Sequence, residues 1–270
     1  MSLNRAALIL ALSSVVLAAG PAAAQAKTER DSEGAVSATF SYTANKDRTQ
    51  YRNLKVVISR AGAPVLTTTL PKYKDFWPGG AIDNSSVDVS DLDADGEPEV
   101  TVKLYSGGAN CCLGSIIYRY RAATNDYAGK FTDFGRYGFT VRELNRTAPP
   151  ELVTADIRFS GAFGTVTAEQ RAPVRILQYS KGRLVNVTRS HPASLRKDLA
   201  ELRKDYPRYV KAKANRRGIL ACIAADQLML NDSAGAARTF KRVEVIYGRE
   251  FGKRLRLFLA RRGYKLQASG

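Results

Sequence analysis

The 270-residue chain has only three cysteines and one histidine, and it lacks the sequence signatures of common enzyme classes. No G-x-S-x-G, P-loop, H-E-x-x-H or kinase motif is present. The single histidine, His191, stands beside a proline and is interpreted as a loop residue rather than a catalytic base. These absences favour a protein that is not an enzyme. An extracytoplasmic hydrolase with an unrecognised active site is the alternative, because missing motifs do not exclude chemistry.

The cysteines are Cys111, Cys112 and Cys222, and an odd number leaves at least one thiol unpaired within the chain. Adjacent residues have Cα atoms about 3.8 Å apart, below the roughly 4.4 Å of ordinary disulfides, so a Cys111–Cys112 bond would be strained. Pairing of one of them with Cys222 and burial as small apolar side chains are the other interpretations. Zinc is not expected, since no C-x-x-C spacing or neighbouring histidine accompanies them.

The first 26 residues have the pattern of a cleaved signal peptide. Arg5 provides the positive charge, 6–18 form an apolar run, and Ala24-Gln25-Ala26 is an A-x-A cleavage signal, with cleavage after Ala26 or alternatively after Ala24. The apolar run is shorter than the roughly 18–20 residues that cross a bilayer. We therefore predict a secreted or periplasmic protein with no transmembrane span in the mature chain.

Positive charge is distributed unevenly over a chain whose total net charge is +17. Residues 27–190 contain 22 basic and 18 acidic residues, a net +4, whereas residues 191–270 contain 19 and 7, a net +12. The difference predicts two domains, a β-rich repeat domain over 36–190 and a basic helical domain over 191–270. Residues 27–35 are polar and show no periodicity, so they are predicted to be a disordered lead-in.

Short runs of β-branched and aromatic residues, bounded by Gly, Pro, Asn and Asp, predict antiparallel strands in the first domain. After residue 191 the apolar spacing becomes helical. Ser194 is predicted to cap a first helix that Pro207 stops, and further helices fit about 216–230, 234–246 and 250–262. The predicted fold is α+β, an N-terminal antiparallel β domain of two or three repeats followed by a small α-helical domain.

Residues 91–99, Asp-Leu-Asp-Ala-Asp-Gly-Glu-Pro-Glu, concentrate negative charge in a basic chain. Eight acids and no Lys or Arg lie between Asp75 and Val102. Carboxylates at alternate positions with glycine sixth have the spacing of a calcium loop. An EF-hand is excluded, because its twelfth position is Val102 and the residues after 99 alternate like a strand. The predicted Ca²⁺ ligands are the side chains of Asp91, Asp93, Asp95 and Glu99 and the main-chain carbonyl of Glu97.

The same nine residues resemble the Asp-x-Asp-x-Asp-Gly-x-x-Asp/Glu loop of FG-GAP/VCBS repeats, the blades of integrin-α-like β-propellers. The resemblance implies blade-like β repeats that bind calcium at these residues. The segment 107–112, Gly-Gly-Ala-Asn-Cys-Cys, also resembles exported bacterial proteins of unknown function that carry Gly-Gly-x-x-Cys-Cys after such a loop. Two or three repeats do not close a propeller of 4–8 blades, so the exposed edges of the partial array must be covered. The C-terminal helices are therefore expected to dock on or beside the repeats.

A second copy of the loop is indicated 52 residues downstream, where Glu143–Leu152 aligns with Asp91–Val100. Leucine, proline and glutamate are identical at matching positions. The second copy has Thr147 and Ala148 in place of Asp95 and Gly96, so it is interpreted as a repeat that has lost its metal.

The C-terminal part has two dense series of basic residues, which either form solvated helix faces or contact a polyanion. An anionic envelope polymer, a membrane surface or another protein is the predicted partner. Nucleic acid is not expected, because the chain is predicted to be exported and has no recognition motif. The two series are Arg196, Lys197, Arg203, Lys204, Arg208, Lys211, Lys213, Arg216 and Arg217, and Lys253, Arg254, Arg256, Arg261, Arg262 and Lys265.

Overall fold

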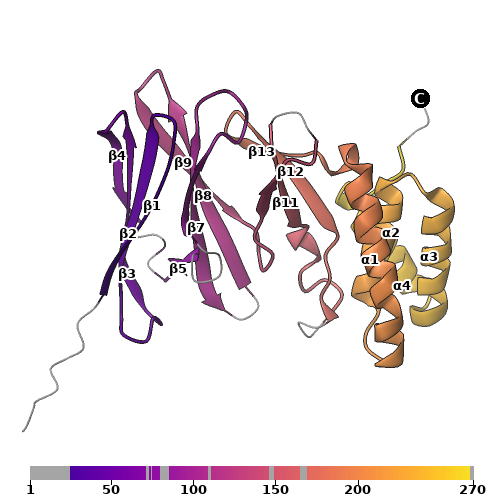
Figure 1. Cartoon of the computed structure of the whole chain (residues 1–270). Coiled ribbons are helices and arrows are strands. Elements are labelled where there is room, and N and C mark those ends of the chain that lie inside the picture. The colour runs from indigo at the N-terminus through magenta and orange to yellow at the C-terminus, as the bar shows by residue number, and fades with distance from the viewer. Residues whose placement is uncertain are drawn as a thin grey trace, which may run out of the picture.

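The computed structural model describes residues 25–70, 73, 75–79, 85–108, 111–145, 149–164 and 169–267, so that residues 1–24 of the predicted signal peptide lie outside it. Within these ranges the chain forms three antiparallel sheets followed by four α-helices, which confirms the predicted α+β fold class and the order of its parts. Figure 1 shows the sheets side by side in chain order, with the helices beyond the third sheet. The elements therefore form an open row.

Each sheet is built from strands that follow one another in sequence. The first has the order β1 (Gln25–Glu33), β2 (Val36–Ala44), β3 (Tyr51–Arg60) and β4 (Ala63–Thr69). In the second, β7 (Glu99–Gly108) pairs on one side with β5 (Trp77–Pro78) and β6 (Val87–Ser90) and on the other with β8 (Cys111–Arg121), which pairs with β9 (Asp126–Asp133). The third has the order β10 (Thr140–Arg142), β11 (Glu151–Ala155), β12 (Val174–Ser180) and β13 (Arg183–Asn186).

Alternating apolar and polar residues decide how the sheets pack. In β2 the apolar residues from Val36 to Ala44 are buried, and they alternate with serines and threonines. One core joins the first and second sheets, and its largest buried side chains include Phe40, Ile58 and Leu104. A smaller core joins the second and third sheets and contains Leu92, Ile117, Phe134, Leu152, Leu177 and Tyr179.

The four helices pack on the third sheet, as expected for a unit that covers the end of a partial repeat array. They are α1 (Pro192–Lys211), α2 (Arg217–Met229), α3 (Ser233–Tyr247) and α4 (Arg249–Arg261). Nearly all of α2 is buried, which fits an apolar helix at the centre of a bundle. The helical core includes Phe159 of η3 (Ile157–Phe159), and Val174 of β12 packs against it. Among the described residues, no helix is long and apolar enough to cross a membrane.

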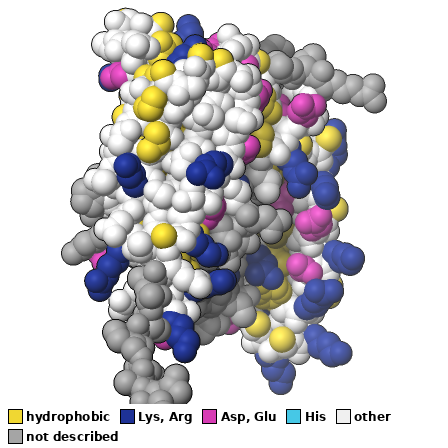
Figure 2. All heavy atoms as spheres, turned by 60° about the vertical axis from the view of Figure 1, so that its left-hand side comes forward, with side chains coloured by type: hydrophobic (Ala, Val, Ile, Leu, Met, Phe, Trp, Pro, Cys, Tyr) yellow, Lys and Arg dark blue, Asp and Glu magenta, His cyan; other side chains and the backbone are white. Residues whose placement is uncertain are grey.

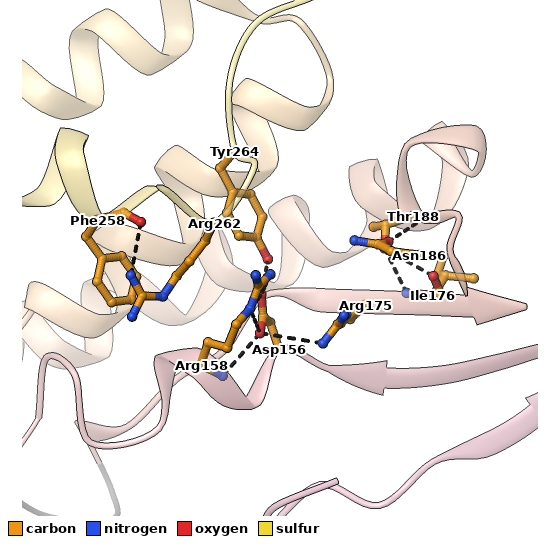
Figure 3. Close-up of polar contacts among 9 residues, drawn as sticks. All are labelled: Asp156, Arg158, Arg175, Ile176, Asn186, Thr188, Phe258, Arg262 and Tyr264. Carbon is orange, nitrogen blue, oxygen red and sulfur yellow. Dashed lines mark hydrogen bonds and ion pairs between the residues drawn. The ribbon is translucent and has the colours of Figure 1, made fainter. Parts of the chain in front are cut away.

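Asp156 forms the polar part of the joint between the third sheet and the helices (Figure 3). Its buried carboxylate accepts hydrogen bonds from Arg158 Nε and from the Tyr264 hydroxyl, both at 2.8 Å. Burial alone would raise the pKa of Asp156, but the hydrogen bonds from Arg158 and Tyr264 outweigh it and lower the pKa. Since Tyr264 follows α4, this contact ties the end of the described chain to the sheet.

The predicted disordered lead-in over 27–35 is wrong, because Gln25–Glu33 forms the edge strand β1 and pairs with β2 over its whole length. The polar and charged composition suggested disorder, but the carboxylates of β1 accept hydrogen bonds from its own sheet and from the neighbouring one. Glu29 accepts from Ser86 N at 2.5 Å and from the Tyr42 hydroxyl at 2.7 Å, and Asp31 accepts from Val89 N at 2.7 Å. A charged edge strand also resists pairing with other chains.

The first helix begins earlier and ends later than predicted. His191, rather than Ser194, is the N-cap residue, and Pro192 occupies the first turn, where its missing N–H costs nothing. Pro207 lies inside α1 instead of stopping it, because the buried side chains of Leu202 and Tyr209 hold both sides of the proline against the helical core.

The outer face of the first sheet is polar, which suits the end of an open row. The residues of β2 that alternate with the buried ones are Ser37, Thr39, Ser41 and Thr43. Figure 2 brings this end forward and shows a mostly uncharged, non-hydrophobic surface with separate Lys and Arg side chains. Such a face needs no further layer to bury apolar area.

Candidate cation site in the loop between β6 and β7

The acidic loop lies between β6 and β7 and is folded by its own carboxylates. Asp91 Oδ1 accepts from Asp95 N at 3.3 Å and its Oδ2 from Gly96 N at 2.9 Å. Gly96 has a φ of 86° and Ala94 a φ of 55°, both in the left-handed region. Glycine at the sixth position therefore permits the turn, as the sequence predicted.

Asp91, Asp93 and Glu99 each place a carboxylate oxygen within 4.8 Å of the others. Calcium binds oxygen at about 2.3–2.6 Å, so two oxygens on opposite sides of one ion lie roughly 4.6–5.2 Å apart. Asp93 Oδ1 is buried without a hydrogen-bond partner in the described part of the chain, and the Asp93 side chain is only 7% exposed. An all-oxygen set with one unsatisfied buried oxygen fits a hard divalent cation.

Glu99 is the most deeply buried of these acids, with 1% exposure. Its Oε2 accepts from Leu92 N at 3.0 Å. Burial, followed by the charges of Asp93 and Asp95, raises the pKa of Glu99 to about 8, although the bond from Leu92 and the charge of Arg119 oppose the shift. A buried carboxylate next to other acids is an unfavourable arrangement that a bound cation relieves.

The side chain of Asp95, a predicted ligand, and that of Glu97, whose main-chain carbonyl is the predicted ligand, pair with arginines from neighbouring strands. Asp95 Oδ2 accepts from Arg119 Nη2 at 2.8 Å, and the Glu97 carboxylate pairs with Arg60. The structure thus brings together Asp91, Asp93 and Glu99 but not the side chains of Asp95 and Glu97. Ligation by Asp95 and by the Glu97 carbonyl stays a prediction.

Arg119 and Arg60 were missed in the sequence because they lie far from the loop along the chain. Arg119 Nε lies 3.7 Å from carboxylate oxygens of both Asp93 and Glu99, too far for a hydrogen bond, and it has no hydrogen-bond partner in the described ranges. Against five carboxylates these two guanidinium groups leave a formal charge of −3. The arginines therefore reduce the negative charge of the loop without removing it.

The loop contacts all three sheets. Arg60 belongs to β3 of the first sheet and Arg119 to β8 of the second. Asp93 Oδ2 accepts from the backbone N of Lys181, in the turn between β12 and β13 of the third sheet, at 3.2 Å. A cation in this loop would consequently stand where the whole row is connected.

The proposed second copy of the loop repeats one hydrogen bond of the acidic loop. Leu144 N donates to Glu151 Oε2 at 2.9 Å, as Leu92 N does to Glu99, and both pairs are seven residues apart. The other Glu151 oxygen accepts from Asn145 Nδ2 at 3.1 Å and lies 3.4 Å from His191 Nε2. Nitrogen groups thus surround the glutamate in this copy, whose residues 146–148 lie outside the described ranges.

A third copy, missed in the sequence, connects β2 and β3. Asn45 Oδ1 accepts from Thr49 N at 2.8 Å and Gln50 N at 3.0 Å, repeating the pattern of Asp91 with the residues four and five positions later. Arg48 has a φ of 53°, matching Ala94 three residues after the first position of its loop. This copy was hidden because Asn45, Thr49 and Gln50 stand where the acidic loop has Asp91, Asp95 and Gly96, although Asp47 keeps a carboxylate at the third position.

The cysteines do not join the two parts of the chain. Cys112 is disulfide-bonded, whereas Cys222 is a buried free thiol in α2, so pairing with Cys222 is excluded. Burial, followed by the charges of Asp226 and Asp198, raises the pKa of Cys222. A buried thiol of this kind is unreactive.

No protein-family model matches this chain, and no solved structure matches it. A curated protein of Synechocystis sp., described as a probable thylakoid lumen protein, is 27% identical to it over 150 residues. The alignment covers 53% of this chain and 43% of that protein, so the chain spans less than half the length of the relative it matches. This similarity does not assign a family, and the resemblance to FG-GAP/VCBS repeats stays a prediction.

Proposed function

We propose that this chain is an extracytoplasmic, non-enzymatic Ca²⁺-binding module. The ion stabilises the row of sheets, and the basic helices contact an anionic partner. The row itself corresponds to FG-GAP/VCBS-type repeats in an open array. The A-x-A signal at 24–26 and the lumenal description of the relative both support a place outside the cytoplasm.

The observation that carries the proposal is the approach of three carboxylates around an unsatisfied buried oxygen. Oxygens of Asp91, Asp93 and Glu99 lie within 4.8 Å of one another, and Asp93 Oδ1 has no hydrogen-bond partner among the described residues. Without a cation, the folded state holds like charges together at a buried position, which is costly. With Ca²⁺ the same oxygens become ligands.

The position of the loop supports a structural role for the ion. The loop is bound to Arg60 of the first sheet and to the Lys181 amide of the third. Extracellular calcium modules bind with dissociation constants of about 10⁻⁴–10⁻³ M. At about 1 mM free ion, a Kd near 10⁻⁴ M adds roughly 1.4 kcal/mol to the free energy of unfolding.

Thermal unfolding in chelator and in 1 mM Ca²⁺ tests this proposal. For a domain of this size, about 1.4 kcal/mol raises the Tm by roughly 3–6 °C. Asp93→Asn removes one charged ligand but keeps an oxygen for Lys181 N, so it should fold and lose the Ca²⁺-dependent rise. The same concentration of Mg²⁺ should raise the Tm less, since Mg²⁺ demands near-ideal octahedral geometry.

Asp47→Asn is the matched control, because Asp47 is exposed and occupies the third position of the loop between β2 and β3. This variant makes the same charge change and should keep the full response to Ca²⁺. Equal melting of the unmodified protein in chelator and in Ca²⁺ would refute the proposal. Loss of the response in both variants would show a general charge effect instead of a site.

A further inference from the structure

A concave pocket lies between α1, α2 and α3, at the opposite end of the row from the first sheet. Its volume is about 230 Å³, below the roughly 300–1,000 Å³ of sites that enclose a drug-sized ligand. The pocket therefore suits one charged group of a ligand rather than a whole molecule. The lining residues used below are Arg203, Tyr206, Gln227, Arg238, Thr239 and Arg242.

The pocket has three arginines and no acid in its lining. Arg203 comes from α1 and Arg238 and Arg242 from α3, and all three are exposed. In the described ranges none of them forms an ion pair, whereas other arginines of the helices do, for example Arg256 with Glu244 at 2.9 Å. Arg242 lies 5.5 Å from the centre of the Tyr206 ring, which holds its guanidinium near the pocket.

The floor of the pocket is polar and fixed. Gln227 and Thr239 are buried, with 3% and 8% exposure. In the amide orientation that satisfies both of its ends, Gln227 donates to Thr239 Oγ1 at 2.8 Å and accepts from Arg203 Nη2 at 3.2 Å. Arg203 is thus positioned by a neutral amide, and no acid in the lining of the pocket compensates its positive charge. The Thr239 hydroxyl accepts from Gln227, so its own O–H is available to donate to a ligand.

The acids along α3 and at its start are engaged elsewhere: Glu244 pairs with Arg256 at 2.9 Å, and Asp232 caps the helix. Asp232 is the N-cap residue of α3, and its side chain accepts from Gly235 N at 2.8 Å. A side chain on Gly235 would collide with this carboxylate and with Gln227. Glycine at this position therefore allows Gln227 to pack directly against the first turn of α3. Asp232 therefore caps the helix instead of neutralising the arginines.

We propose that this pocket binds a phosphoryl group, with Arg203, Arg238 and Arg242 as the cationic ligands. Guanidinium groups form charge-assisted, often bidentate hydrogen bonds with phosphate oxygens. Arginines from two helices offer more donors than one planar carboxylate accepts, and a dianionic phosphomonoester matches their charge better. This inference rests on the proposed function in one respect: it gives the anionic contact of the helices a defined place.

Binding of a soluble phosphomonoester, glucose 6-phosphate, and of vesicles containing phosphatidic acid tests the site in the full chain at low salt and in chelator. Arg238→Gln with Arg242→Gln should weaken binding by about tenfold or more. Lys241→Gln with Arg249→Gln removes the same charge from exposed positions outside the pocket and should change affinity less than about twofold. Acetate serves as the carboxylate comparison and should bind more weakly.

Binding of the soluble phosphomonoester would identify a free ligand, whereas binding of the vesicles alone would identify a lipid headgroup. Either result supports the site if the binding depends on Arg238 and Arg242. Equal losses in both double variants, tighter binding of acetate, or no binding to either probe would overturn it. In NMR spectra of the unmodified protein, the phosphomonoester or the vesicles should perturb the Gln227 side-chain amide and Gly235 N. Perturbation only at other residues would also overturn the proposal. Because this measurement uses the unmodified protein, it does not depend on whether the arginine variant folds. The Ca²⁺ melting experiment is independent of all these outcomes.

Discussion

Replacing Asp226 by asparagine should stabilise the protein, although Asp226 is a fully buried residue in the centre of the helical core. Asp226 faces a second acid, Asp198 of α1, whose Oδ2 accepts from Val174 N at 2.8 Å. Neither Asp226 oxygen has a hydrogen-bond partner among the described residues. The pair is therefore satisfied only when Asp226 carries a proton and donates it to Asp198.

The expected gain follows from the cost of keeping that proton at neutral pH. Burial, followed by the charge of Asp198, raises the pKa of Asp226 well above its ordinary value. Each pH unit between the unfolded pKa, about 3.9, and the raised folded pKa costs about 1.4 kcal/mol of stability. The contribution of Asp226 to the free energy of unfolding is thus fully present below about pH 3.9, where the group is protonated in both states. This contribution is lost as the pH rises through the folded pKa. Asparagine donates without titrating, so Asp226→Asn should gain about 1–3 kcal/mol at pH 7.

Urea unfolding of both proteins between pH 4 and pH 8 measures this effect. The difference in the free energy of unfolding should be smallest at pH 4 and grow with pH. Asp205→Asn, at a partly exposed position of α1 where Asp205 pairs with Arg208 at 3.2 Å, serves as the control and should show no such growth. A less stable Asp226→Asn variant, or a difference that does not depend on pH, would refute the shared-proton interpretation.

Two further predictions concern polar contacts that join layers. Tyr264→Phe removes the 2.8 Å hydrogen bond to Asp156 and should lower the free energy of unfolding in urea by about 1–2 kcal/mol. Backbone hydrogen exchange after α4 should become faster, and unchanged exchange there would contradict the proposed connection between Tyr264 and the sheet. Glu29→Ala leaves Ser86 N and the Tyr42 hydroxyl without their acceptor and should cost about 1–3 kcal/mol. Hydrogen exchange at Ser86 should accelerate while the third sheet stays protected, and equal acceleration in both sheets would argue against a local contact.

The sequence predicted the features that depend on neighbouring residues. The β-branched and aromatic runs 100–105 and 116–120 indicated strands, and the spacing of Phe251, Leu255 and Leu259 indicated the last helix. The turn of the acidic loop was predictable for the same reason, because its hydrogen bonds join residues four and five positions apart.

Features that depend on distant residues were not predicted. The strand formed by 25–33 is explained by donors on Ser86 and Val89, more than fifty residues away. Arg119 enters the acidic loop from another strand, so counting charges within the loop overestimated its negative charge. Arg238 and Arg242 stand apart from the dense basic series, and only the packing of α1, α2 and α3 turns them into a pocket with Arg203.

The loop between β6 and β7 also bears on how the molecule unfolds. In an open row each layer packs only on its neighbours, an arrangement that allows layers at one end to come apart while the others persist. Contacts from this one loop to Arg60 and to the Lys181 amide connect the outer two sheets across the middle one. Disorder in either outer sheet is thereby transmitted to the other, so the loop makes unfolding of the β row more nearly all-or-none.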